Sequence, residues 1–191
     1  KWYFPYILCY EKIEKIQMNI FALSTGKGPS GIAILRLSGK DSLQILKLIT
    51  KKNDIKSKEV NLCKFYDPSN GKMIDEGLLL WSPGPNSYTG EDLAEFHTHG
   101  SNAVVSSFLK VLGNQENCRL AEPGEFTKLA FQNNKINLLK AESIGDLIAA
   151  ETELQRKQAL RIMSGDSSKK FNLWREELIK ALADIEAKID F

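Results

Sequence analysis

The feature that most constrains the fold is a change of hydrophobic pattern near residue 135. Before it, short strand-like runs alternate with helical stripes; after it, only two long helical patterns follow, at 138–163 and 168–190. Alternating apolar residues are typical of half-buried strands, whereas spacings of three and four are typical of helices. The sequence therefore predicts an α+β domain, a boundary at 135–138, and a helical hairpin joined by Ser164-Gly165-Asp166.

The first domain contains five strand-like runs and three helical ones. Ser38 or Asp41 is available to cap the first helix, and Gly100-Ser101 precedes the second. The expected strands are 20–23, 31–37, 59–66, 73–80 and 92–99; the expected helices are 41–50, 102–112 and a short one with Pro123 in its first turn. The segment 81–92, with two prolines and two glycines, is predicted to be an irregular loop.

Composition narrows the function classes. The 191 residues are 42% apolar and 26% charged with a net charge of +2, which is ordinary for a soluble protein and argues against a dedicated nucleic-acid surface. The lysines at 51–58 are interrupted by Asp54 and indicate a solvated loop. Three scattered cysteines favour a reducing compartment, and no apolar run reaches the about 20 residues that span a bilayer.

Residues 1–17 differ from the remainder of the chain. Their short apolar part lacks a small-residue cleavage site, and they contain no arginine, so neither a secretory signal nor a transit peptide fits. We expect a non-native or disordered extension, with the natural start of translation at Met18.

Three glycines, Gly26, Gly28 and Gly31, have the spacing of a dinucleotide-binding loop. That motif requires a helix after the loop, but Gly31 leads into an alternating strand-like run. No Walker-type sequence occurs either. The chain therefore has no recognisable nucleotide-binding motif.

Two charged residues lie on strand faces that are otherwise partly apolar. Arg36 shares a face with Ile32 and Ile34, and Glu95 shares one with Leu93 and His97. One interpretation is a buried ion pair between Arg36 and Glu95. The other is a polar anchor for a ligand, because a fixed carboxylate can accept two hydrogen bonds from an aminopyrimidine ring. Both interpretations stay open at this point.

The histidines His97 and His99 could suggest a metal site. No third ligand is evident in the sequence, so we expect no metal site and assign His99 to a loop or helix cap before Gly100.

Three stretches, GIAILRLSG, GPNSYTGEDLAEFHTHG and RLAEPGEFTKLAFQNNKINLLKAESIGDLI, resemble the N-terminal part of the MnmE (TrmE) family of tRNA modification GTPases. The resemblance covers about 18–191 with three segments in the family's order. It implies an α+β fold: a folate-binding domain with a mixed sheet, similar to the aminomethyltransferases of glycine cleavage, at 18–135. The first helices of a helical domain would follow at 136–191, with the GTPase domain absent.

The resemblance also implies function. The folate contacts carry over to Arg36, Glu95 and Lys135, with no catalytic or metal residue in these 191 residues. A tetrahydrofolate derivative, in its 5-formyl or methylene form, would supply the one-carbon unit. GTP, magnesium and potassium are expected only in the missing GTPase domain. The implied setting is a cytoplasmic homodimer that works with an MnmG-type flavoprotein on the wobble uridine of tRNA, with no membrane association.

Two departures from the family pattern are visible. Met18-Asn19-Ile20 stands where the family usually has Asp-Thr-Ile, and the C-terminal segment ending Cys-x-Gly-Lys is missing. These residues alone are therefore expected neither to hydrolyse GTP nor to modify tRNA. Two alternatives remain open: a dimerisation module that binds no ligand, and a free-standing folate-dependent aminomethyltransferase-like protein.

Overall fold

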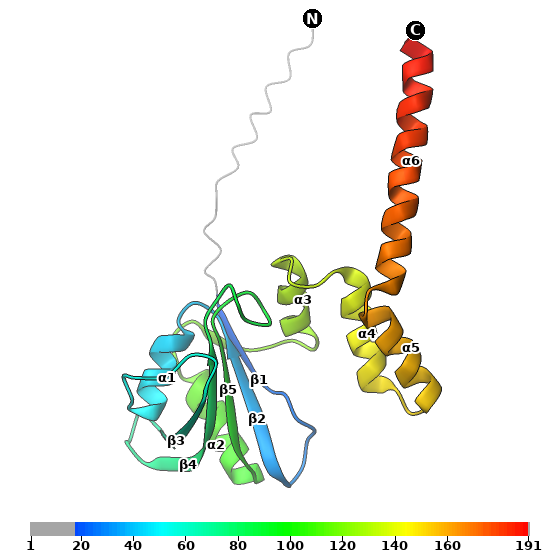
Figure 1. Cartoon of the computed structure of the whole chain (residues 1–191). Helices are drawn as coiled ribbons and strands as arrows, with labels where there is room; N and C mark the ends of the chain where they lie inside the picture. The colour runs from blue at the N-terminus through cyan, green and yellow to red at the C-terminus, as the bar shows by residue number, and fades with distance from the viewer. Residues whose placement is uncertain (1–17, 191) are drawn as a thin grey trace, which may run out of the picture. The chain divides into compact units, whose positions relative to one another are not determined.

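The computed structural model of the chain describes residues 18–190, so the expected extension at 1–17 lies outside the described residues. The chain divides into two compact units (Figure 1). The first, which we call the sheet unit, comprises 18–87 and 91–123. The second, the helical unit, comprises 88–90 and 124–190.

The sheet unit holds a six-stranded sheet in the order β3-β4-β5-β2-β1-β6. All neighbouring strands are antiparallel except β1 and β6, which are parallel, so the sheet is mixed as expected. The strands are β1 (Asn19–Leu23), β2 (Ser30–Ser38), β3 (Val60–Tyr66), β4 (Met73–Ser82), β5 (Leu93–Gly100) and β6 (Cys118–Leu120).

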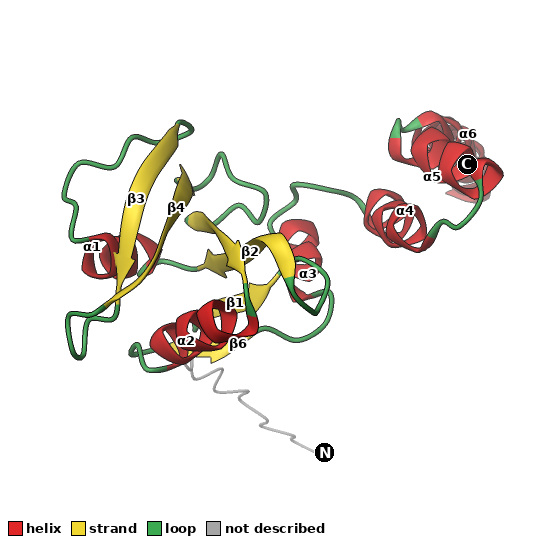
Figure 2. Cartoon of the chain, turned by 90° about the horizontal axis from the view of Figure 1, so that it is seen from below, coloured by secondary structure: helices red, strands yellow, loops and turns green. Residues whose placement is uncertain are grey.

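One face of the sheet forms the core because every second residue of each strand points to it. Helices α1 (Ser42–Thr50) and α2 (Asn102–Gly113) lie on this side (Figure 2). Three fully buried phenylalanines, Phe65, Phe96 and Phe108, join β3, β5 and α2, with ring centroids 5.0–5.6 Å apart. These edge-to-face and tilted contacts fix the sheet against α2.

The helical unit contains α3 (Glu125–Gln132), α4 (Leu138–Ala149), α5 (Glu153–Met163) and α6 (Asp166–Asp190). The buried residues of its helices are small: Ala130, Ser143 and Ala159. Small side chains let helices approach closely, but they bury little apolar area each.

The prediction of one helix over 138–163 is wrong. The helix is interrupted at 150–152, because Thr152 and Gln155 form a capping box that begins α5. In addition, α6 begins at Asp166 rather than at 168.

Three other sequence expectations need correction. Strand β4 continues through Trp81 and Ser82 into the predicted loop, because these residues pair with Ala94 and Leu93 before Pro83 stops the strand. Strand β6 was not predicted; its three residues are too few to show a pattern. Asp41 stands at the N-cap of α1 without capping it, since its carboxylate accepts a hydrogen bond from Asn19 instead.

Candidate functional site

Arg36 and Glu95 face each other on the central strands β2 and β5. They are directly opposite in the antiparallel register, on the side of the sheet away from the α1 and α2 core. The Arg36 guanidinium donates through Nε to Glu95 Oε1 at 2.9 Å, and its NH2 lies 2.7 Å from the same oxygen. Their side chains are 26% and 19% exposed. The structure thus brings together the two charged residues that the strand-face argument selects.

Only one oxygen of the Glu95 carboxylate is used by this pair. The other, Oε2, accepts no hydrogen bond from any residue in 18–190, and the imidazole Nε2 of His97 lies 3.9 Å from it. A carboxylate held at one oxygen keeps acceptor capacity at the other. The arrangement is therefore a half-satisfied ion pair that can still accept a hydrogen bond from a ligand.

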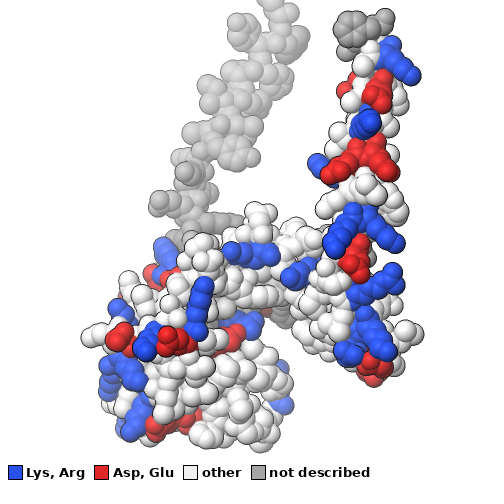
Figure 3. Space-filling view, in the orientation of Figure 1, with Lys and Arg blue, Asp and Glu red and all other residues white. Residues whose placement is uncertain are grey.

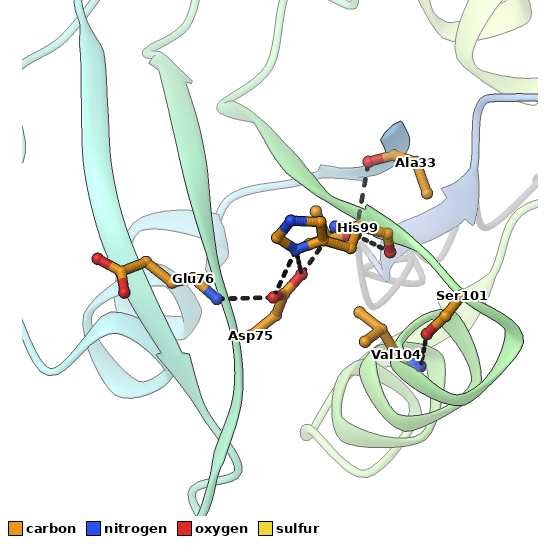
Figure 4. Close-up of polar contacts among 7 residues, drawn as sticks. Ala33, Asp75, Glu76, His99, Ser101 and Val104 are labelled. Atoms are coloured by element: carbon orange, nitrogen blue, oxygen red, sulfur yellow. Dashed lines mark hydrogen bonds and ion pairs between the residues drawn. The ribbon is translucent and has the colours of Figure 1, made fainter. Parts of the chain in front are cut away.

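A second acid–histidine contact lies farther along β4 and β5 (Figure 4). The Asp75 carboxylate accepts hydrogen bonds from the backbone N–H of His99 at 2.7 Å and of Glu76 at 2.8 Å, and the His99 ring Nδ1 lies 2.9 Å away. Burial alone would raise the pKa of Asp75, but these hydrogen bonds together hold the pKa below its ordinary value.

His99 lies in strand β5 rather than in a loop, and it does not cap the helix that follows. The cap of α2 is Ser101, whose hydroxyl accepts from the Val104 N–H (Figure 4). Sequence reasoning missed the partnership of Asp75 with His99, because the register between β4 and β5 cannot be read from either strand alone. Within 18–190, no three His, Cys, Asp or Glu side chains are grouped to hold a metal ion.

Lys135 belongs to the helical unit and follows α3. Its backbone N–H donates to Ala130 at 2.8 Å, and Asn133 donates its side-chain amide to the Thr89 carbonyl at 2.7 Å. A Cβ at Gly90, whose φ is +81°, would lie 2.9 Å from Asn133 Cβ and 3.2 Å from Lys135 Cε. Only glycine fits this close approach. Lys135 is thus held beside loop residues 89–90 of the helical unit, whereas Arg36 and Glu95 belong to the sheet unit.

The two cysteines of the sheet unit are poor nucleophiles. Burial, followed by the nearby Asp41 carboxylate, raises the pKa of Cys118 to about 11. Burial also raises the pKa of Cys63. Because the thiolate is the reactive form, both side chains stay protonated and unreactive near neutral pH.

The geometry defines a class of protein: a mixed-sheet α+β domain followed by a helical region. The domain carries a charged pair on the sheet face opposite the α1 and α2 core, which we call the open face. A family model described as GTP-binding protein TrmE N-terminus matches residues 19–135, and one described as MnmE helical domain matches 138–191. The chain belongs to the MnmE (TrmE) family.

Individual relatives support the assignment of the chain to this family. The chain is 59% identical over 174 residues to the tRNA modification GTPase MnmE of Pelagibacter ubique, covering 91% of this chain and 39% of that protein. It is 47% identical over 180 residues to the Brucella anthropi protein of the same name, covering 94% and 40%. It is also 49% identical over 174 residues to the human mitochondrial 5-taurinomethyluridine-[tRNA] synthase subunit GTPB3, covering 91% and 35%. The chain thus spans about two fifths of the length of these relatives.

Proposed function

We propose that the sheet unit binds a tetrahydrofolate derivative through Glu95, as the N-terminal part of a tRNA-modifying GTPase. The observation that carries this proposal is the open Oε2 of a carboxylate whose Oε1 is already held by Arg36. A pterin ring presents an amino group and a neighbouring ring N–H, which form a planar pair of donors suited to a carboxylate.

The residues around Glu95 fit such a ligand chemically. Arg36 holds the carboxylate at Oε1 and restricts its rotation, so less side-chain entropy is lost on binding. Ala22 and Leu80 are the cross-strand neighbours of Arg36 and Glu95 and provide an apolar floor for a flat ring. Lys135 is proposed to balance acceptor or carboxylate groups of the ligand. When bound, the folate would supply the one-carbon unit, in its 5-formyl or methylene form.

We also propose that the sheet unit forms a homodimer through the open face of the sheet. Four apolar side chains on three strands are solvent-exposed on this face: Ile32, Val60, Leu62 and Leu78. Contiguous exposed apolar residues are typical of protein interfaces. A second copy would cover them and reduce the solvent access of the Arg36–Glu95 pair.

The remaining parts of the proposal come from the relatives. The names of these relatives give tRNA modification and GTPase activity. With the family resemblance, they support our proposal of wobble-uridine modification of tRNA with an MnmG-type flavoprotein in the cytoplasm, and of GTP, magnesium and potassium in a GTPase domain. No helix within 18–190 is long and apolar enough to cross a membrane.

A dimerisation module without a ligand is the second candidate. The ion pair between Arg36 and Glu95 favours it, because each charge already has a partner. The match of the MnmE helical domain to 138–191 argues against a free-standing aminomethyltransferase.

Calorimetric titration of the full chain with 5-formyl-tetrahydrofolate tests the folate site. We expect Glu95→Gln to lower the affinity about thirtyfold, equivalent to about 2 kcal/mol, because the charged acceptor is lost while the shape is kept. Glu116→Gln, on an exposed loop of the same unit, is the matched control and should bind like wild type.

Light scattering of the same samples tests the interface separately. Wild type and Glu95→Gln should both be dimers, whereas Leu62→Glu should be monomeric. Equal folate affinity in Glu95→Gln and wild type would remove the folate assignment. Dimers that ignore folate altogether would favour the ligand-free module.

A further inference from the structure

A cleft of about 460 Å³ lies within the helical unit, between α5 and the beginning of α6. Residues of α5 spaced by three and four positions form one wall, which includes Leu154, Arg161 and Ile162. The first turns of α6 contribute Asp166 and Lys170. The cleft therefore combines apolar and charged side chains from two helices of one unit.

Cations outnumber carboxylates in the part of α5 and α6 that lines this cleft. Between Leu154 and Arg175, six cations accompany one carboxylate, that of Asp166, and the carboxylates of Glu151, Glu153, Glu176 and Glu177 flank this stretch. Figure 3 shows Lys and Arg gathered over α5 and the first part of α6. The six cations are Arg156, Lys157, Arg161, Lys169, Lys170 and Arg175.

The cations differ in how they are paired. Arg156 is held by both oxygens of Glu153 at 2.8 Å, and the same carboxylate lies 3.6 Å from Lys157. Arg161 and Lys170 form no ion pair with any carboxylate in 18–190, and both are exposed. Two unneutralised cations thus face one cleft from opposite helices.

This set of groups suits one phosphodiester of a nucleic acid. A guanidinium matches two phosphate oxygens at once, and an ammonium adds a point charge from the other side. Leu154 and Ile162 offer apolar contact to the adjoining sugar or base. Asp166 would repel a phosphate but can accept a hydrogen bond from a ribose 2′-hydroxyl, the group that distinguishes RNA from DNA.

We propose that the α5–α6 cleft binds a backbone phosphate of tRNA through Arg161 and Lys170. This inference rests on the proposed function, which makes tRNA the substrate. It assigns an RNA contact to the helical unit, although the charge of the whole chain gives no sign of one.

The test is binding of a fluorescently labelled, unmodified tRNA transcript to the full chain, followed by anisotropy over a range of salt concentrations. We expect Arg161→Gln/Lys170→Gln to bind about tenfold more weakly at moderate salt. The slope of log affinity against log salt should fall by about 2, because two phosphate-facing cations are lost. The control Lys180→Gln/Lys188→Gln removes the same charge farther along α6 and should stay within about twofold of wild type.

Equal tRNA affinities and salt slopes in the two double variants would overturn the inference.

Titration of the same variants with 5-formyl-tetrahydrofolate checks their folding and separates the two proposals. If folate binds but the tRNA affinities of the double variants are equal, only the inference about the cleft fails. If folate does not bind but tRNA binding depends on Arg161 and Lys170, only the folate assignment fails.

Discussion

The sheet unit and the helical unit are stabilised in different ways. The sheet unit closes a core of large side chains between one sheet face and two helices, with Phe65, Phe96 and Phe108 fully buried. The helical unit buries mainly small residues, and no described side chain of α6 is buried. Because apolar stabilisation scales with buried area, the sheet unit is expected to be much the more stable of the two.

Helix α6 shows the contrast most clearly. A row of exposed apolar residues follows it at intervals of three or four positions, which is the spacing of a helix that packs against a neighbour. These residues are Phe171, Trp174, Leu178, Leu182, Ile185 and Ile189. Its aromatic pair, Phe171 and Trp174, packs edge-to-face at 5.5 Å while remaining exposed. Aromatic side chains are therefore buried in the core of the sheet unit but exposed on α6, where they contribute less to stability.

Truncation of one phenylalanine in each unit should give the largest difference in the free energy of unfolding between two variants. Phe96→Ala should lower the free energy of unfolding of the sheet unit by about 3–5 kcal/mol, because it leaves a cavity beside Phe65 and Phe108. Phe171→Ala, on the exposed face of α6, should cost less than about 1 kcal/mol. Urea denaturation followed by the fluorescence of buried Trp81 measures the first effect, and far-ultraviolet circular dichroism the second. Similar losses in both variants would contradict the contrast.

Loss of the α5 cap should have a smaller effect, confined to the helical unit. Thr152→Ala removes the hydroxyl that accepts from the Gln155 N–H, and should cost about 1 kcal/mol. Hydrogen exchange should show faster exchange in the first turn of α5 and unchanged protection of β2 and β5. Faster exchange in those strands would show that the two units are coupled in stability.

The smallest expected effect is the pH dependence contributed by Asp75. Its pKa is lower in the folded than in the unfolded chain, so its contribution to stability is present above the ordinary carboxyl pKa of about 3.9. That contribution is lost as the pH falls through the lower, folded value. Asp75→Asn should therefore be less stable than wild type near pH 6, by about 1 kcal/mol or less, and the difference should shrink towards pH 2–3. Denaturation of both proteins across this range measures it; a constant difference would contradict the assignment.

The Arg36–Glu95 pair shows how far the sequence leads towards the site. Strand alternation placed each residue on a partly apolar face, but a period of two cannot say which strands are neighbours. The register of β2 against β5 makes them direct partners and leaves Glu95 Oε2 open. Lys135 was assigned through the family resemblance alone, and its folate role remains a proposal.

The sequence by itself determined the order of the elements apart from β6 and the division between α4 and α5, the change from mixed structure to helices, and the family. These properties depend on local periodicity and on motifs that are contiguous in the chain. The break between α4 and α5 was readable in Thr152 and Gln155, yet the continuous apolar pattern obscured it.

Only the tertiary structure decided the pairing of Asp75 with His99, the parallel strand β6, and the cation-lined cleft between α5 and α6. Each depends on contacts between residues that belong to different strands or helices, and the local hydrophobic periodicity of the chain does not report such contacts. Such contacts are fixed by how whole elements pack, and the free energy that selects that packing is spread over the core rather than encoded at the residues in contact.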